Sequence, residues 1–347
     1  MKMRDSKRPI SSAGRSIKRC SYLIFAFIAA CALTPAVCAD DSDPAAPYGV
    51  LVSNVWNNTA RNYPAYNNAN SPYSEMGVDY NNSHDLESAW FSNPSANLTV
   101  PAAGDLRGTV GSSYSWWTTY FTTANSPVTL ATPGDQLNLT WVFTPTGVAS
   151  ANTSQGFDLA VVRTPTGRLT ADGSPSSQAF AGYAMYMNMG TTLGNSNPFQ
   201  LKEWIVGSST LLGTSGNWGA NGGSGGLANG GTSGNQGYAS GTTYTFTMSF
   251  TLLSISPTAT NLQISATMAG GSLNNSGSET LTYNDTTPNS LTYDTFSIRP
   301  HDLTQAASQF DTSLFEVQFQ NIPEPSTFAL VTVALGGLLL ATRRSRR

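Results

Sequence analysis

The fold is decided by residues 243–253, which read Thr-Tyr-Thr-Phe-Thr-Met-Ser-Phe-Thr-Leu-Leu. Large apolar side chains alternate in this segment with threonine and serine, which is typical of a strand with one buried side and one solvent-facing side. Burying five such side chains contributes on the order of 8 to 15 kcal/mol before chain entropy is subtracted. The pattern therefore predicts a central β-strand whose core-facing residues are Tyr244, Phe246, Met248, Phe250 and Leu252.

The same alternation recurs along the chain between turns rich in glycine, proline and aspartate. It predicts strong strands over residues 136–143, 261–268 and 313–320, and further strands over 49–56, 86–91, 114–121, 156–163, 180–189, 199–206, 280–283 and 294–299. About a dozen short strands predict an all-β fold of two packed antiparallel sheets. We expect residues 40–321 to form a two-sheet antiparallel β-sandwich, a jelly roll resembling the concanavalin A-like lectins. A β-helix or propeller is disfavoured because no repeat of about 20 to 50 residues recurs.

The charge of the chain is unevenly distributed. Residues 40–321 carry six basic side chains against 18 acidic ones, a net charge of −12. An acidic body repels phosphate backbones, so we do not expect nucleic acid as a partner. All three cysteines precede this body, which therefore has no thiol that could mispair in an oxidising compartment: Cys20, Cys31 and Cys38.

The N-terminal segment has the layout of an export signal. Seven basic residues lie within residues 1–19, and the apolar run 22–32 follows. The signal-peptidase motif is formed by the small residues Val37 and Ala39, which precede the acidic residue Asp40. These features predict a signal peptide over 1–39 that signal peptidase removes after Ala39. The alternative is a lipobox, Ile-Ala-Ala-Cys, that ends at Cys31.

The C-terminal segment, residues 322–347, combines a short motif, an apolar run and a basic end. The motif is Pro323, Glu324, Pro325 and Ser326, and residues 326–342 carry no charge. At a rise of about 1.5 Å per residue this run forms a helix of about 26 Å, enough to span a thin bilayer. Four arginines follow this uncharged run and hold the C-terminus in the cytoplasm: Arg343, Arg344, Arg346 and Arg347. The segment predicts a transmembrane helix with the body outside.

This tail resembles the PEP-CTERM sorting signal of Gram-negative and related bacteria. The resemblance implies that an exosortase, a membrane cysteine protease or transpeptidase, recognises residues 323–326, removes the helix and releases or re-attaches the body. It implies an exported protein of the cell surface or extracellular matrix, in contact with exopolysaccharide, with a structural or adhesive role. The body also resembles the uncharacterised bodies that precede such tails, and that resemblance carries no activity. A plain tail anchor is the alternative to sorting.

The sequence assigns no catalytic residue, metal site or cofactor. His84 and His301 each precede an aspartate, but sequence neighbours need not face one another, and no Gly-x-Ser-x-Gly motif is present. Jelly-roll glycanases place carboxylates on alternate residues of one strand. Here Glu316 is followed at the required positions by Gln318 and Gln320, so hydrolysis would need Glu316 to meet Glu203. No EF-hand spacing is present, but four aspartates are candidate calcium ligands: Asp79, Asp85, Asp285 and Asp294.

Sugar binding requires fewer specialised groups than catalysis does, namely exposed aromatic faces beside short polar groups. A strand over 114–121 sends Tyr114, Trp116 and Tyr120 to one face and two other aromatic residues to the opposite face. The segment 213–241 contains 12 glycines and predicts a flexible surface loop in which Trp218 could close over a ligand. Tyr114, Trp116, Tyr120 and Trp218 are therefore the candidate ligand-binding residues. They make a carbohydrate-binding module or glycan-active enzyme the alternative to a structural role.

Overall fold

The computed structural model describes residues 49–56, 88–102, 104–122, 126–176, 179–220 and 225–321. The predicted signal peptide over 1–39, the sorting motif with its helix over 322–347, and His84 lie outside the described residues. Within those ranges there is no helix with the length and hydropathy that a membrane crossing requires.

The described residues form two eight-stranded sheets and one small two-stranded sheet, and every strand pairing in them is antiparallel. The strands are β1 (Val50–Asn54), β2 (Trp90–Asn93), β3 (Leu98–Ala102), β4 (Asp105–Thr109), β5 (Trp116–Tyr120), β6 (Val128–Thr129), β7 (Gln136–Val148), β8 (Phe157–Arg163), β9 (Ala181–Met187), β10 (Phe199–Trp204), β11 (Trp218–Gly219), β12 (Ala228–Asn229), β13 (Tyr244–Ile255), β14 (Thr260–Ala269), β15 (Ser278–Asp285), β16 (Thr292–Tyr293), β17 (Thr295–Pro300) and β18 (Ala307–Gln320). Single turns of 3-10 helix occur at Ser95–Asn97, Ser215–Asn217 and Leu273–Asn275.

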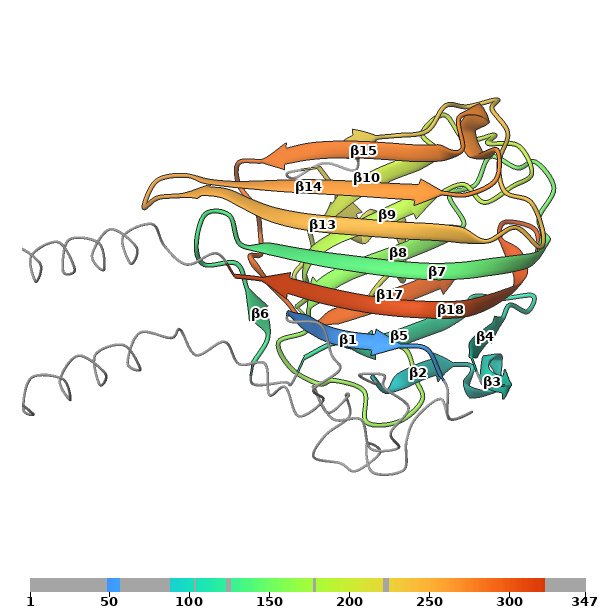
Figure 1. Cartoon of the computed structure of the whole chain (residues 1–347), viewed down its shortest axis with the longest axis horizontal. Coiled ribbons are helices and arrows are strands. Elements are labelled where there is room, and N and C mark those ends of the chain that lie inside the picture. Colours follow the sequence, from blue (N-terminus) through green and yellow to red (C-terminus); the bar gives the residue numbers. More distant parts are fainter. Residues whose placement is uncertain are drawn as a thin grey trace, which may run out of the picture. The chain divides into compact units, whose positions relative to one another are not determined.

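Sheet A has the order β15-β14-β13-β7-β18-β4-β3, with β1 also paired to β18. Sheet B has the order β11-β10-β9-β8-β17-β5-β2, with β12 also paired to β10. In Figure 1 the long strands of sheet A pass in front of β8, β9, β10 and β17 of sheet B. The expected two-sheet antiparallel sandwich is confirmed, and β13 lies inside sheet A between β14 and β7 as the alternation predicted.

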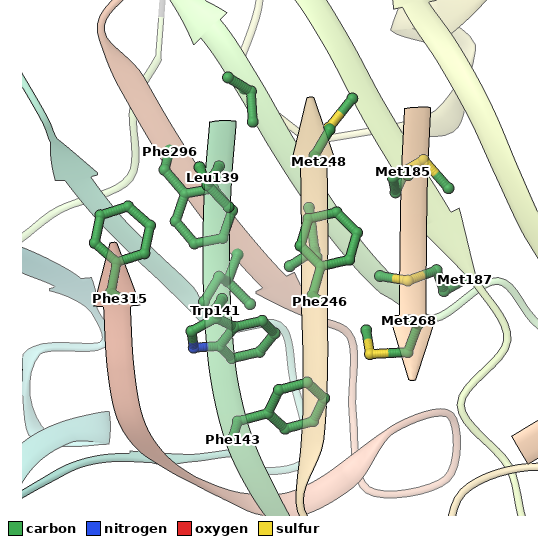
Figure 2. Close-up of a cluster of buried hydrophobic side chains, with 14 of the residues drawn as sticks. Leu139, Trp141, Phe143, Met185, Met187, Phe246, Met248, Met268, Phe296 and Phe315 are labelled. Atoms are coloured by element: carbon green, nitrogen blue, oxygen red, sulfur yellow. The ribbon is translucent and has the colours of Figure 1, made fainter. Parts of the chain in front are cut away.

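The core lies between the two sheets and contains the predicted face of β13, whose five alternate apolar side chains are all buried. Figure 2 shows how the two sheets contribute to it: Trp141 of β7 and Phe315 of β18 lie near Phe296 of β17. The rings of Trp141 and Phe143 stack with centroids 4.1 Å apart. Methionines fill the neighbouring space, which suits their flexible side chains: Met185, Met187, Met248 and Met268.

The glycine-rich segment 213–241 differs from the expected flexible loop. It contains β11 and β12, which both pair with β10 and extend the edge of sheet B. Two of its aromatic residues, Trp218 and Tyr238, are almost fully buried. Strands β3 and β4 were also not predicted, because Pro101, Gly104 and Gly108 interrupt any alternation there. Cross-strand pairing and burial therefore order segments whose own sequence has weak strand propensity.

The outer face of sheet B is partly covered by loops. A second apolar cluster lies on it, in which Leu211 and Leu212 pack over Ala160 and Ala184. Beyond it, a buried ion pair joins Arg168 to Asp294 with Nη2 and Oδ2 3.0 Å apart, and it ties the loop after β8 to the sheet. A polar stretch of the same face lies under these loops between Gln200 and Tyr114, and this stretch is the candidate site.

Candidate functional site

A row of polar side chains crosses four neighbouring strands of sheet B on its outer face. The strand registers align Gln200 of β10 with Tyr186 of β9, Tyr186 with Asp158 of β8, and Asp158 with Arg299 of β17. We call these four residues the polar row. Antiparallel neighbours in register have side chains about 5 Å apart, so the row presents a continuous line of polar groups.

The row faces outward because its residues alternate with core residues. Asp158 lies between Phe157 and Leu159, and Arg299 follows Ile298; all three of these neighbours belong to the core between the sheets. Successive side chains of a strand point to opposite faces, so the intervening polar residues must leave the core. The row is nevertheless covered by loops and neighbouring side chains, with Asp158 fully buried and Arg299 only 3% exposed.

Asp158, Arg299 and His301 meet at one point of the site. Asp158 Oδ2 lies 2.8 Å from His301 Nε2 and 3.5 Å from Arg299 Nη1. Arg299 Nη1 also lies 2.8 Å from His301 Nε2. Nε2 can donate to the carboxylate or accept from the guanidinium, but it cannot do both. Burial raises the pKa of Asp158, and the hydrogen bond from His301 opposes this increase.

Two aromatic rings accompany the guanidinium at the solvent-facing end of the row. The Arg299 Cζ lies 3.8 Å from the ring centroid of Tyr114 and 4.9 Å from that of Trp116. The Trp116 Nε1 donates to the carbonyl oxygen of Leu211 at 3.0 Å, which fixes the indole against the covering loop. Tyr114 is 45% exposed, so it is the side chain through which the site meets solvent.

Lys202 lies on β10 two residues from Gln200, on the same outer face. Its Nζ is 4.4 Å from the ring centroid of Tyr186, and the residue is 5% exposed. Among the described residues no side chain or carbonyl forms a hydrogen bond or ion pair with it. Burial lowers the pKa of Lys202, while the nearby charge of Asp158 opposes this shift.

Several buried polar atoms of the site have no hydrogen-bond partner among the described residues. They are Asp158 Oδ1, Tyr186 Oη and Arg299 Nε. An unsatisfied buried polar group costs about 1 to 3 kcal/mol, more when it is charged. These three atoms are enclosed by protein, so each leaves an uncompensated polar group beneath the surface of the site.

The structure brings together only part of the set expected from the sequence. Tyr114 and Trp116 lie beside Arg299 at the polar row. Tyr120 is fully buried under the loop after β8, where its hydroxyl accepts from the Leu169 amide at 2.8 Å. Trp218 is fully buried against Trp204, with centroids 5.0 Å apart, so it presents no free ring to a ligand.

The carboxylates considered for catalysis are not brought together. Glu203 shares the inner side of β10 with Leu201, and its Oε1 accepts from the Asn289 amide at 2.8 Å. Glu316 lies on the outer face of sheet A, where it accepts from Gln318 at 2.7 Å. The hypothesis of a Glu203–Glu316 pair is wrong, because the two residues project from different sheets and to different sides.

The calcium candidates that can be placed have protein partners. Asp285 accepts from the Tyr183 hydroxyl at 2.8 Å, and Asp294 pairs with Arg168. Asp79 and Asp85 lie outside the described residues, and within those residues no group of three potential ligands could hold a metal ion. His301 contacts Asp158 in place of its sequence neighbour Asp302, which accepts from Thr304 in its own turn.

Sequence reasoning missed the centre of the site. Gln200, Tyr186, Asp158 and Arg299 come from strands that are adjacent only after folding. A usable signal was present, because Asp158 interrupts an apolar run of strand residues, and Lys202 is the sole lysine after residue 19.

No protein-family model matches the chain, and no curated protein sequence matches it. Solved structures with some similarity include an endo-1,3-β-glucanase from Streptomyces sioyaensis, at 12% identity and a TM-score of 0.39, covering 81% of this chain and 100% of that one. Peanut lectin with a 9mer peptide has 11% identity and a TM-score of 0.38, covering 67% and 92%. The metal-free Emp46p carbohydrate recognition domain has 9% identity and a TM-score of 0.38, covering 66% and 87%.

Proposed function

We propose that the β-sandwich body is a carbohydrate-binding module whose ligand lies on the outer face of sheet B. The observation that carries the proposal is the polar row, in which buried polar atoms without protein partners end at an aromatic pair next to solvent. A sugar hydroxyl both donates and accepts, so it can pair with polar groups at the solvent-facing end of the row, where Tyr114 is exposed. The ring of Tyr114 offers an apolar surface on which a pyranose can stack.

Binding without turnover fits the composition of the row. Hydrolysis of a glycosidic bond commonly uses two carboxyl groups about 5 to 9.5 Å apart. Asp158 is the one carboxylate of the polar row, and its Oδ2 is already engaged by His301 and Arg299. We therefore propose a binding module in place of a glycan-active enzyme.

The finer assignment of the fold, a concanavalin A-like jelly roll, is also part of the proposal. It is supported by the path of the chain, which runs from β7 in sheet A through β8, β9 and β10 in sheet B and back to β13. The last two long strands repeat this exchange, because β17 belongs to sheet B and β18 to sheet A.

The route of the protein to the cell surface belongs to the proposal as well. The motif at residues 323–326 and the arginine end of the tail support sorting by an exosortase after export. Such a tail would place the sandwich next to the exopolysaccharide that surrounds the cell. A glycan-binding face on an exported body would give it an adhesive role there.

The binding proposal is tested with the full chain on a glycan array, followed by titration calorimetry with the best ligand. We expect Tyr114→Ala and Trp116→Ala each to weaken binding about three- to tenfold, the loss of one aromatic contact worth about 0.5 to 1.5 kcal/mol. Ile255→Ala is the matched control, because Ile255 is 44% exposed at the end of β13 in sheet A. It should bind as the unchanged protein does.

Two outcomes would contradict the proposal. If no glycan binds, or if Ile255→Ala weakens binding as strongly as Tyr114→Ala, the outer face of sheet B is not the binding surface. Release of shortened products from a bound polysaccharide would show that the protein is an enzyme and not a binding module.

A further inference from the structure

The charge balance around the polar row differs from that of the body. Residues 40–321 hold 18 acidic side chains and six basic ones. Around the row, however, the described residues place two cations, Lys202 and Arg299, against two carboxylates, Asp158 and Asp302. Farther along the same face Arg168 and Asp294 neutralise each other. This part of an acidic protein therefore repels an anion less than the rest of the body does.

Lys202 forms no ion pair with any residue that the structure describes. Asp158 Oδ2 is shared by His301 at 2.8 Å and Arg299 at 3.5 Å. Asp302, the other carboxylate near His301, accepts from Thr304 and Gln305. Lys202 is left over the Tyr186 ring at 5% exposure. The nearby charge of Asp158 compensates this cation only in part, so an anion from outside the chain can form the ion pair that the described residues do not provide.

We infer that the glycan bound on the outer face of sheet B is anionic, with a carboxylate or sulfate group on its pyranose rings that pairs with Lys202. The inference rests on the proposed function and adds the chemical class of the ligand. Tyr114 would stack on a ring of this glycan while Lys202 holds its charged substituent. An exposed aromatic ring on the same face as an unpaired cation suits a charged sugar better than a neutral one.

The test compares tetragalacturonate with its fully methyl-esterified form, which keeps the sugar skeleton and removes the charge. Calorimetry with the full chain should show the acid form binding at least tenfold more tightly. Lys202→Met should remove most of this preference while leaving the ester unaffected, and Lys202→Arg should retain it. Preference for a sulfated galactan tetrasaccharide over its desulfated form would also support the inference and would identify sulfate as the anion.

Arg107→Gln is the matched control, since it removes one cation from sheet A, where Arg107 Nε donates to Asp311 at 2.6 Å. Its binding should be unchanged. A second measurement needs no variant: Lys202 is the sole lysine after residue 19, so reductive dimethylation read by peptide mass spectrometry reports on it alone. Saturating tetragalacturonate should protect Lys202 from modification.

Equal binding of the charged and neutral form of each pair would overturn the inference and leave the proposed glycan binding standing. Unchanged labelling of Lys202 under saturating tetragalacturonate would overturn it as well, even if Lys202→Met failed to fold. Absence of binding to every glycan would instead overturn the proposed function itself.

Discussion

Glu279 shows how one buried side chain sets a pH dependence for the whole fold. It lies on β15 opposite Met268, fully buried, and its Oε1 has no hydrogen-bond partner among the described residues. The Tyr238 hydroxyl is 3.5 Å from its Oε2. Burial raises the pKa of Glu279 from 4.5 to about 8, and the hydrogen bond from Tyr238 opposes the increase. Glu279 is therefore protonated in the folded protein at neutral pH.

The direction of the effect follows from proton linkage. A carboxyl whose folded-state pKa lies above its unfolded-state value binds its proton more tightly when the chain is folded. Its contribution to the free energy of unfolding is complete below pH 4.5 and is lost as the pH rises through about 8. Glu203 acts in the same direction, because burial raises its pKa to about 7.

We predict that Glu279→Gln makes the protein less sensitive to alkaline pH. Glutamine resembles the protonated carboxyl in shape and cannot ionise. The variant should therefore avoid a decrease in the free energy of unfolding, on the order of 4 kcal/mol, between pH 5 and 9. Urea unfolding across this pH range measures the difference. Glu316→Gln, on the outer face of sheet A, is the control. An unchanged pH slope in Glu279→Gln would show that the buried carboxyl ionises without penalty.

At the scale of elements, the glycine-rich segment behaves as the edge of a sheet. The amides of Leu227 and Gly230 donate to the carbonyl oxygens of Leu201 and Phe199, each at 2.8 Å, on either side of β12. A Cβ added to Gly230 would lie 2.5 Å from the carbonyl oxygen of Thr280. Glycine is needed here because the backbone of β15 approaches too closely for a side chain.

Alanine substitution distinguishes this close approach from a flexible loop. We predict that Gly230→Ala lowers the free energy of unfolding by about 1 to 3 kcal/mol, because the added methyl group must displace a backbone carbonyl. A Cβ at Gly225 would meet no atom within 4 Å, so Gly225→Ala should be neutral. Denaturant unfolding of both variants provides the measurement. If both substitutions were tolerated equally, the loop predicted from the glycine content would be the better description.

At the scale of the whole molecule, the two sheets share one main core. An export signal and a sorting signal are predicted at the two ends of the chain. Trp141 illustrates the shared core, since its ring lies 5.9 Å from Phe157 and 6.3 Å from Phe296 of the opposite sheet. The described residues of both sheets therefore share one core.

We predict that the protein recovered from the cell envelope starts at Asp40 and ends within residues 323–325. Mass spectrometry of both terminal peptides measures this directly. A mature surface form that still contains Arg347 would reduce the tail to an ordinary membrane anchor. A start at Cys31 would show lipid attachment in place of signal-peptidase cleavage after Ala39.

The strongest strands were predictable because their information is local. In 243–253 and 136–143 a residue faces the core or the solvent according to whether its position along the strand is odd or even. This alternation can be read directly from the sequence. Strands β3, β4, β11 and β12 were not predictable, because pairing with a neighbour stabilises them and their own composition does not. The short pairing of β11 and β12 with β10 depends on where the rest of sheet B already lies.

The candidate site divides in the same way. Tyr114 and Trp116 could be chosen from the sequence, since a shared face follows from their spacing on one strand. The other members of that set became buried, Tyr120 under the loop after β8 and Trp218 against Trp204 of β10. The polar row joins Asp158 to Arg299, 141 positions later in the chain, through the register of β8 and β17.

By itself the sequence determined the class of fold, the acidic and thiol-free character of the body and the prediction of export, because alternation, composition and terminal motifs are local or additive properties. The tertiary structure alone decided which aromatic rings remain exposed, which carboxylate faces His301, and that Lys202 lies over the Tyr186 ring without an ion pair among the described residues. These features depend on strand register and loop packing, which bring together residues far apart in the chain through contacts that no single segment encodes.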